Sequence, residues 1–265
     1  MKTALYQVDA FAGELFRGNP AAVMPLERFL SDTTLLAIAG ENNLSETAFL
    51  VKDGMDYRLR WFTPAAEVPL CGHATLASAA VVLERLEAGR ESVAFHTLSG
   101  VLTVKKVEDG YAMDFPAQEC KRTEVRAEVA EALTENPVEV FQNERFTLVL
   151  LESAAGVRVL APDFARVAQL DPHGVIVTAA GEDGYDCVSR FFAPNLGVNE
   201  DPVTGSAHCV LAPFWSKRLG KKSIRAYQAS ARGGELLCTC AGERVELQGK
   251  CLFYLEGEAT IPDRA

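Results

Sequence analysis

The chain has 265 residues and a formal net charge of −10, and no cluster of lysines and arginines interrupts this acidity. Nucleic acid and anionic membrane surfaces are therefore not expected as partners. The length suits one large domain or two of ordinary size. The first residues lack a secretory-signal pattern and no apolar stretch reaches spanning length, so we expect a cytoplasmic protein. Seven cysteines, an odd number, suit reduced thiols there.

Hydrophobic periodicity, caps and turns predict the same order of elements twice. In the first half we expect strands at 3–11 and 21–26, a helix at 33–41, strands at 45–52 and 57–62, a helix from 72 to about 86, and strands at 92–97, 100–107 and 110–115. In the second half we expect a short helix near 124–133, strands at 138–142 and 145–151, a helix at 162–170, strands at 174–180 and 185–192, a helix from 205 to about 219, and strands at 223–229, 234–240, 243–247 and 250–255.

The strands are short and hairpin-linked, which argues against a βαβ sheet. We expect an α+β fold of two pseudo-symmetric domains, each a curved mixed β-sheet wrapped around a central apolar helix. Residues 116–123 form the joint in this interpretation, which gives domains at 1–118 and 119–265.

A repeated turn supports the duplication. Glu67–Ala74 and Glu200–Ala207 share Glu, Pro, Gly and Ala at the same four places, and the related segments Arg60–Pro64 and Arg190–Pro194 precede them. The spacing is about half the chain, which indicates two related domains rather than a repeat array. Three positions differ in chemistry between the copies: Val68 corresponds to Asp201, Cys71 to Thr204 and His73 to Ser206.

Gly72 and Gly205 each open a helix in these turns. The first N–H groups of a helix lack partners within it and carry partial positive charge, so each turn suits an anion, most simply a carboxylate. Pseudo-symmetry predicts that the two turns face each other across a ligand-binding cleft. In the alternative interpretation, the glycines only allow close packing of helix on sheet.

Glu46 is the first candidate for proton chemistry. Strand alternation places it with Ala48 and Leu50, on a face that should be buried. Burial of a carboxylate is costly unless it is paired or used, and it raises the pKa toward a working value. An exposed edge position is the alternative.

Other polar residues of the two turns are weaker candidates. Asp201 is also typical of an ordinary turn, and His73 of a structural histidine at a helix start. Cys71 is a candidate nucleophile or base, with a pKa lowered by the helix start, whereas Thr204 cannot serve as a second thiol. The remaining histidines are interpreted as structural: His96, His173 and His208.

At these residues the chain resembles the PhzF-like family, named for the isomerase of phenazine biosynthesis. The resemblance covers essentially the full length, and its motifs are together highly specific. They are Val8–Phe11, Gly18–Val23, Asn43–Phe49, Arg60–Pro64, Leu70–Thr75, Arg190–Pro194, Glu200–Ala207 and Gln228–Gly234.

The resemblance implies the fold of diaminopimelate epimerase, a cytosolic homodimer, and no metal or organic cofactor. It assigns to Glu46 the role of catalytic acid/base, which moves a proton from one carbon of the substrate to another. It places His73, Asp201 and Ser206 around the substrate, where they assist that transfer. It assigns substrate binding to the turns at Gly72 and Gly205, which also contain Cys71 and Thr204.

We therefore expect a cofactor-independent isomerase that acts on a small carboxylated molecule. Racemases of the same fold use two opposed cysteines; Cys71 matches the first, but Thr204 occupies the place of the second. A racemase or epimerase that uses Cys71 is one alternative. A member of the family that binds a small molecule or a protein without catalysis is the other.

Overall fold

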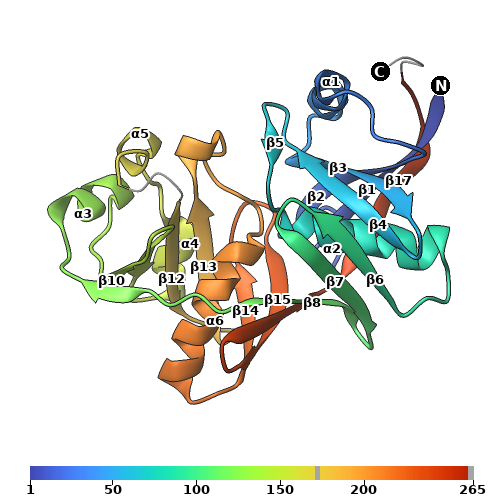
Figure 1. The fold of residues 1–265 in the computed structure, drawn as a ribbon. Helices are drawn as coiled ribbons and strands as arrows, with labels where there is room; N and C mark the ends of the chain where they lie inside the picture. Colours follow the sequence, from blue (N-terminus) through green and yellow to red (C-terminus); the bar gives the residue numbers. More distant parts are fainter. Residues whose placement is uncertain (171–173, 262–265) are drawn as a thin grey trace. The chain divides into compact units, whose positions relative to one another are not determined.

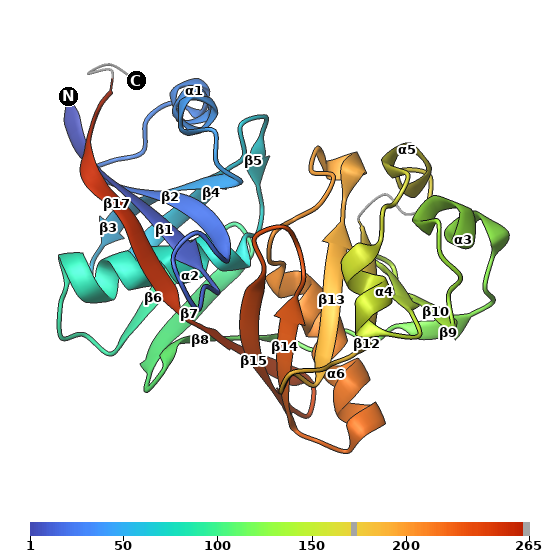
Figure 2. The same cartoon turned by 180° about the vertical axis from the view of Figure 1, so that it is seen from behind.

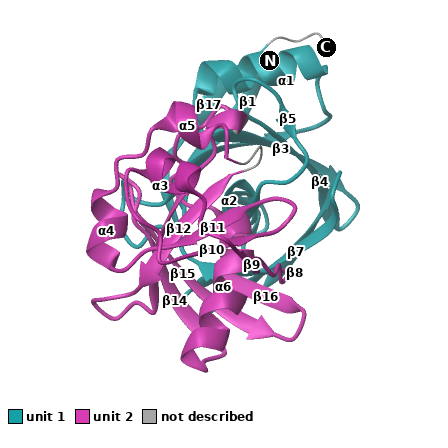
Figure 3. Cartoon of the chain, turned by 90° about the vertical axis from the view of Figure 1, so that its left-hand side faces the viewer, with its two compact units in different colours: residues 1–114, 248–265 teal, residues 115–247 magenta. Residues whose placement is uncertain are grey.

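The computed structural model of the chain describes residues 1–170 and 174–261, so His173 lies outside the described residues. The chain forms two compact units (Figure 3), one of residues 1–114 with 248–265 and one of residues 115–247. Among the described residues, none of the helices is long and apolar enough to cross a membrane.

This division differs from the expected halves, 1–118 and 119–265, because the end of the chain returns to the first unit. Strand β17 (Cys251–Thr260) pairs antiparallel with β1 (Lys2–Ala10) over the whole length of β1, with one register shift. Figure 2 shows the two strands side by side. The last strand of the sequence therefore pairs with the first and completes the sheet of the first unit.

The first unit is a mixed sheet (Figure 1). Its other strands are β2 (Asn19–Leu26), β3 (Glu46–Asp53), β4 (Asp56–Phe62), β5 (Glu67–Val68), β6 (Ser92–Thr97), β7 (Gly100–Val107) and β8 (Gly110–Pro116). They pair in the order β17-β1-β2-β3-β4-β6-β7-β8, and β5 also pairs with β4. The pairs β2–β3 and β4–β6 are parallel and the others are antiparallel.

Helix α2 (Gly72–Val81) is the central helix of this unit (Figure 1). Every residue from His73 to Val81 is buried, and the helix contacts β1, β2, β3, β7 and β17. A helix that is apolar all round must be covered all round, so the sheet encloses it as expected. The chain continues into a π-helical turn, η1 (Val82–Leu86), where a single helix was expected.

Helix α1 (Asp32–Asn42) packs on the opposite face of the sheet, where Leu35 and Ala39 join a cluster that includes Phe49 and Phe62. Ser31 caps the helix, because its side chain accepts a hydrogen bond from the N–H of Thr34. Strand β3 is therefore covered on both faces.

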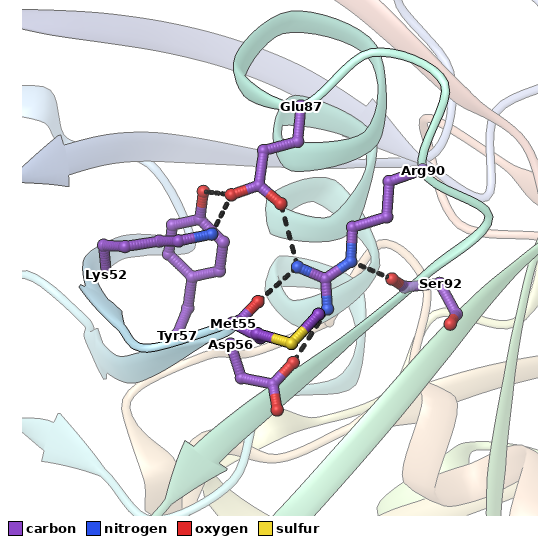
Figure 4. A network of polar contacts seen from close by, with 7 residues as sticks. All are labelled: Lys52, Met55, Asp56, Tyr57, Glu87, Arg90 and Ser92. Carbon is purple, nitrogen blue, oxygen red and sulfur yellow. Dashed lines mark hydrogen bonds and ion pairs between the residues drawn. The ribbon is translucent and has the colours of Figure 1, made fainter.

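A polar network fixes the end of η1 to the β3–β4 hairpin. It contains Lys52, Met55, Asp56, Tyr57, Glu87, Arg90 and Ser92 (Figure 4). The carboxylate of Glu87 accepts hydrogen bonds from Lys52, from the Tyr57 hydroxyl at 2.8 Å and from Arg90 at 2.8 Å. Arg90 also donates to Asp56 at 2.8 Å, so one guanidinium holds both the helix end and the hairpin.

The second unit repeats this plan. Its strands are β9 (Lys121–Thr123), β10 (Glu139–Gln142), β11 (Thr147–Leu150), β12 (Val175–Ala180), β13 (Cys187–Phe192), β14 (Ser223–Gln228), β15 (Gly234–Ala241) and β16 (Arg244–Gly249). Its helices are α3 (Ala127–Leu133), α4 (Ala154–Val159), α5 (Phe164–Val167), the 3-10 turn η2 (Pro194–Leu196) and α6 (Gly205–Leu219).

The strand pairings confirm the duplication. In the first unit β1, β2, β3, β4, β6 and β7 follow one another with antiparallel, parallel, antiparallel, parallel and antiparallel pairs. In the second unit β10 to β15 show the same alternation. The central helix follows the fourth strand of the series in both units, α2 after β4 and α6 after β13.

The second unit differs from expectation in its helices. The predicted helix at 162–170 is the shorter α5, and α4, which was not predicted, precedes it; Ser153 caps α4 by accepting from the N–H of Gly156 at 3.1 Å. Helix α6 is buried over most of its first half against β14 and β15, whereas its last turn is exposed. It is less enclosed than α2.

Candidate active site

Glu46 begins β3, a strand that lies between β2 and β4. The expected burial of its face is confirmed, because Ala48 and Leu50 are fully buried and the Glu46 side chain is 17% exposed. The alternative of an exposed edge position is therefore wrong. The carboxylate lies mostly away from water, where an ionised group needs a partner.

The start of α2 supplies that partner. Cys71 is extended and precedes the helix, and the hydroxyl of Thr75 donates to the Cys71 carbonyl at 2.6 Å. This turn places Nε2 of His73 3.0 Å from Oε2 of Glu46. The other ring nitrogen, Nδ1, lies 3.5 Å from the sulfur of Cys71. The start of α2, with Gly72 as its first residue, thus brings four predicted site residues together: Glu46, Cys71, Gly72 and His73.

The distance between Glu46 and His73 is that of an ion pair, but the geometry is not that of a well-directed hydrogen bond. Among the residues that the structure describes, none gives the buried Oε2 atom of Glu46 a hydrogen bond of acceptable geometry. This carboxylate oxygen is held by charge beside His73 and keeps its hydrogen-bonding capacity for another donor.

The electrostatics of the site differ from the expectation for Cys71. Burial, followed by the negative charge of Glu46, raises the pKa of the Cys71 thiol to about 11, although His73 opposes the shift. The predicted lowering by the helix start is overcome, because desolvation of a thiolate and a nearby carboxylate both disfavour the charged form. The thiol is neutral at neutral pH.

The pKa of His73 is also raised, which favours the charged form of its imidazole, whereas the rise at Cys71 favours the neutral thiol. Burial lowers the pKa of its imidazole, but Cys71 and Glu46 together raise it well above its usual value. Because the thiol is neutral, the charge of Glu46 is the cause of the rise that remains. The imidazole of His73 therefore lies between a carboxylate that favours its protonated form and a neutral thiol.

Glu46, Cys71 and His73 could also supply ligand atoms to a metal ion, since one such atom from each lies within 4.8 Å of the others. Nε2 of His73 lies 3.0 Å from Oε2 of Glu46 and 4.0 Å from the sulfur of Cys71, so this nitrogen is near both of the other groups. A metal ion binds only the deprotonated forms of a thiol and an imidazole, and the pKa values of both groups are raised in this site. The three groups are therefore better suited to passing a proton.

The second turn brings together another set of predicted residues. Thr204 is extended before α6, Gly205 is the first residue of the helix, and Ser206 is half-buried beside it. The Thr204 hydroxyl donates to the carboxylate of the half-buried Asp201. His208, interpreted as structural, contacts the Thr204 carbonyl at 2.8 Å through Nδ1. Thr75 makes the equivalent contact with the Cys71 carbonyl in the first turn. Burial lowers the pKa of His208 to about 4.

An arginine and a glutamate recur in both copies and hold the start of each turn, a role that was not predicted from the sequence. Arg60 binds Glu67 through two hydrogen bonds of 2.7 and 2.6 Å, and Arg190 binds Glu200 in the same way at 2.7 and 2.9 Å. Such bidentate pairs fix orientation as well as distance. The repetition of both residues was the signal that could have identified this support.

The comparisons with known proteins agree with the resemblance. The family profile described as "Phenazine biosynthesis-like protein" matches residues 8–261. An uncharacterized isomerase of Pseudomonas aeruginosa is 50% identical over 97% of this chain and 98% of its own length. A second from the same organism is 49% identical over 98% of this chain and all of its own.

Solved structures show the fold. The crystal structure of a phenazine biosynthesis protein of the PhzF family from Enterococcus faecalis has a TM-score of 0.95 and 45% identity, and it covers 98% of this chain and 100% of that one. A hydroxyproline epimerase of Agrobacterium vitis has a TM-score of 0.60 at 11% identity over 97% of this chain and 92% of its own. That second likeness shows the fold alone. The predicted α+β fold and the predicted isomerase are confirmed, and the chain belongs to the phenazine biosynthesis-like protein family.

Proposed function

We propose that this isomerase moves a proton within a small carboxylated substrate, with Glu46 as the acid/base. The observation that carries the proposal is the mostly buried Glu46 carboxylate, 3.0 Å from Nε2 of His73, with one oxygen that is not engaged in a directed hydrogen bond. A general base must reach the proton that it removes, and a charged partner keeps it ionised until it does so.

His73 and Gly72 have separate roles in this proposal. The imidazolium of His73 stabilises negative charge that develops on the substrate when Glu46 removes the proton. The N–H groups at the start of α2, opened by Gly72, hold the substrate carboxylate. The assistance of Asp201 in the transfer stays a prediction, as does substrate binding by the second turn at Thr204, Gly205 and Ser206. Cofactor independence, the homodimer and the cytoplasmic location also stay predictions.

The test is proton NMR of a panel of small carboxylic acids with the enzyme in deuterium oxide. We expect deuterium at a new carbon with the wild type, and a loss of about 10²–10⁴-fold in rate with Glu46→Gln. Glu258→Gln is the matched control, because this carboxylate is 62% exposed and pairs with Lys2. A Glu46→Gln variant as active as the control would refute the role of Glu46.

The racemase is the second candidate, and the 3.5 Å contact of the Cys71 sulfur with His73 favours it. Its weakness is that a thiol with a pKa of about 11 is a poor base at neutral pH. Deuterium at an existing stereocentre, lost in Cys71→Ser and kept in Glu46→Gln, would establish it. Specific binding without exchange would identify a non-catalytic member of the family.

A further inference from the structure

Gln228 is the last residue of β14 and is fully buried. Its side-chain amide contacts three groups of the turn before α6. Oε1 accepts a hydrogen bond from the N–H of Thr204 at 2.9 Å. Nε2 donates to the carbonyl of Asp201 at 2.8 Å and to the hydroxyl oxygen of Thr204 at 3.2 Å.

Only one orientation of the Gln228 amide satisfies these contacts. The N–H of Thr204 can only donate and the carbonyl of Asp201 can only accept, so the amide oxygen must face the first and the amide nitrogen the second. Because the Thr204 hydroxyl accepts from this nitrogen, its single proton is directed to Oδ2 of Asp201. The result is a polarised chain from amide to hydroxyl to carboxylate.

The two copies of the turn show which part of this arrangement is scaffold. Two residues beyond the end of β6, the Ser99 hydroxyl donates to the Pro69 carbonyl at 2.7 Å. Ser230 lies at the same distance beyond β14 and donates to the Pro202 carbonyl at 2.8 Å. This hydrogen bond from a serine to the proline of the turn is therefore present in both units.

Within the described residues, the contact of Gln228 has no counterpart in the first copy. Thr97 holds the corresponding place at the end of β6, and its hydroxyl donates to the Gly100 carbonyl at 2.7 Å, within its own hairpin. The amide of Gln228 thus occurs in the copy in which Asp201 replaces the apolar Val68. This pairing associates Gln228 with the Asp201 carboxylate rather than with the backbone that both copies share.

We propose that Gln228 is a positioning residue, which holds the Asp201 carboxylate and the first turn of α6 in the geometry that proton transfer requires. The inference deepens the proposed function, in which Asp201 assists that transfer. A group next to the chemistry needs support of this kind, because a displacement of about 1 Å can reduce the rate by about 10²-fold.

Two substitutions separate hydrogen bonding from packing. Gln228→Met keeps the approximate size of the side chain without its donors and acceptor. In Gln228→Glu, a protonated carboxyl can still accept from Thr204 and donate to Asp201, whereas an ionised one has no donor and repels the Asp201 carboxylate. Gln142→Glu is the matched control, because Gln142 donates to the hydroxyl of Thr147 at 3.0 Å, in β10 and away from the turn.

The kinetic readout is the pH profile of kcat and KM, with the carboxylic acid that shows exchange with the wild type. We expect Gln228→Glu to lose kcat as pH rises, with a limb that the wild type lacks, and to reach a loss of about 10–10²-fold. Gln228→Met should be reduced by a similar factor at every pH, and Gln142→Glu should follow the wild type. Wild-type kcat in Gln228→Met, or a wild-type profile in Gln228→Glu, would overturn the proposal.

Hydrogen exchange of the Thr204 amide, measured by NMR, gives a readout that does not depend on activity. We expect faster exchange in Gln228→Met at every pH, and in Gln228→Glu only as pH rises. Unchanged exchange in both variants overturns the proposal even if Glu46 proves to be the acid/base. Changed exchange in a protein without proton-transfer activity would instead contradict the proposed function and leave the holding of the turn by Gln228 established.

Discussion

Cys71 should react slowly with alkylating reagents at neutral pH, although it lies at the start of a helix. Burial and the charge of Glu46 raise the pKa of its thiol from 9.0 to about 11. Only the thiolate is nucleophilic, so at pH 7 its reactive fraction is about 100-fold below that of an ordinary thiol. Because this pKa lies above the accessible range, the rate should rise about tenfold for each pH unit up to about pH 10.

The assay is alkylation with iodoacetamide between pH 6 and pH 10, followed by mass spectrometry of the peptide that contains Cys71. N-acetylcysteine in the same reaction corrects for reagent loss, and Cys71→Ser confirms the peptide assignment. The slope with pH is diagnostic, because limited access to this buried sulfur lowers the rate equally at every pH. A plateau below pH 9 would refute the electrostatic argument and strengthen the racemase alternative.

Three carboxylates allow tests of stability. Hydrogen bonds from Lys52 and other donors lower the pKa of Glu87 from 4.5 to about 2, so its contribution is complete above pH 4.5 and lost as pH falls toward 2. Glu87→Gln should lower the free energy of unfolding by about 1 kcal/mol at pH 7 after allowance for solvent screening, and flatten the fall in Tm between those pH values. Glu200→Gln should lower the free energy of unfolding in urea by about 2 kcal/mol, because it leaves the partly buried Arg190 without its bidentate partner. Glu119→Gln, which breaks the exposed pair with Lys217, should lower it by less than about 1 kcal/mol. Equal losses in these two variants would contradict the greater importance of the partly buried pair.

The parts of the fold that follow from local sequence were predictable. The apolar run after Gly72 required a helix covered on all sides, and α2 is covered in this way. Alternation in β3 required Glu46 to share a buried face with Ala48 and Leu50, and it does. Both predictions used only the pattern of residues within a single helix or strand.

The parts that were missed depend on residues far apart in the sequence. Local pattern does not reveal that β17 pairs with β1, so residues 248–265 were expected in the second domain, whereas they belong to the first unit. The pKa of Cys71 was predicted in the wrong direction because Glu46, 25 positions earlier by residue number, adds its charge to the effect of burial. Gln228 lay within a motif of the resemblance, but its contacts reach back 24 residues to Thr204.

The repeated turns show how one scaffold holds two different sets of functional groups. Within each unit, an arginine–glutamate pair fixes the strand to the first residue of the turn, and a serine hydroxyl fixes the proline two residues later. The positions that differ between the copies lie after that first glutamate and are not part of these contacts. Substitution there changes the functional groups without removing the interactions that hold the backbone.

The resulting groups favour a proton shift over a symmetric racemisation. The first unit offers a carboxylate and an imidazole, Glu46 and His73, with a neutral thiol at Cys71. The second offers a carboxylate, Asp201, held by the Thr204 hydroxyl. Removal and return of a proton by two equivalent thiols needs the same residue in both turns, and the turns do not supply it. One base that both takes and returns the proton needs only the pair in the first unit, which is why Glu46→Gln is the decisive variant.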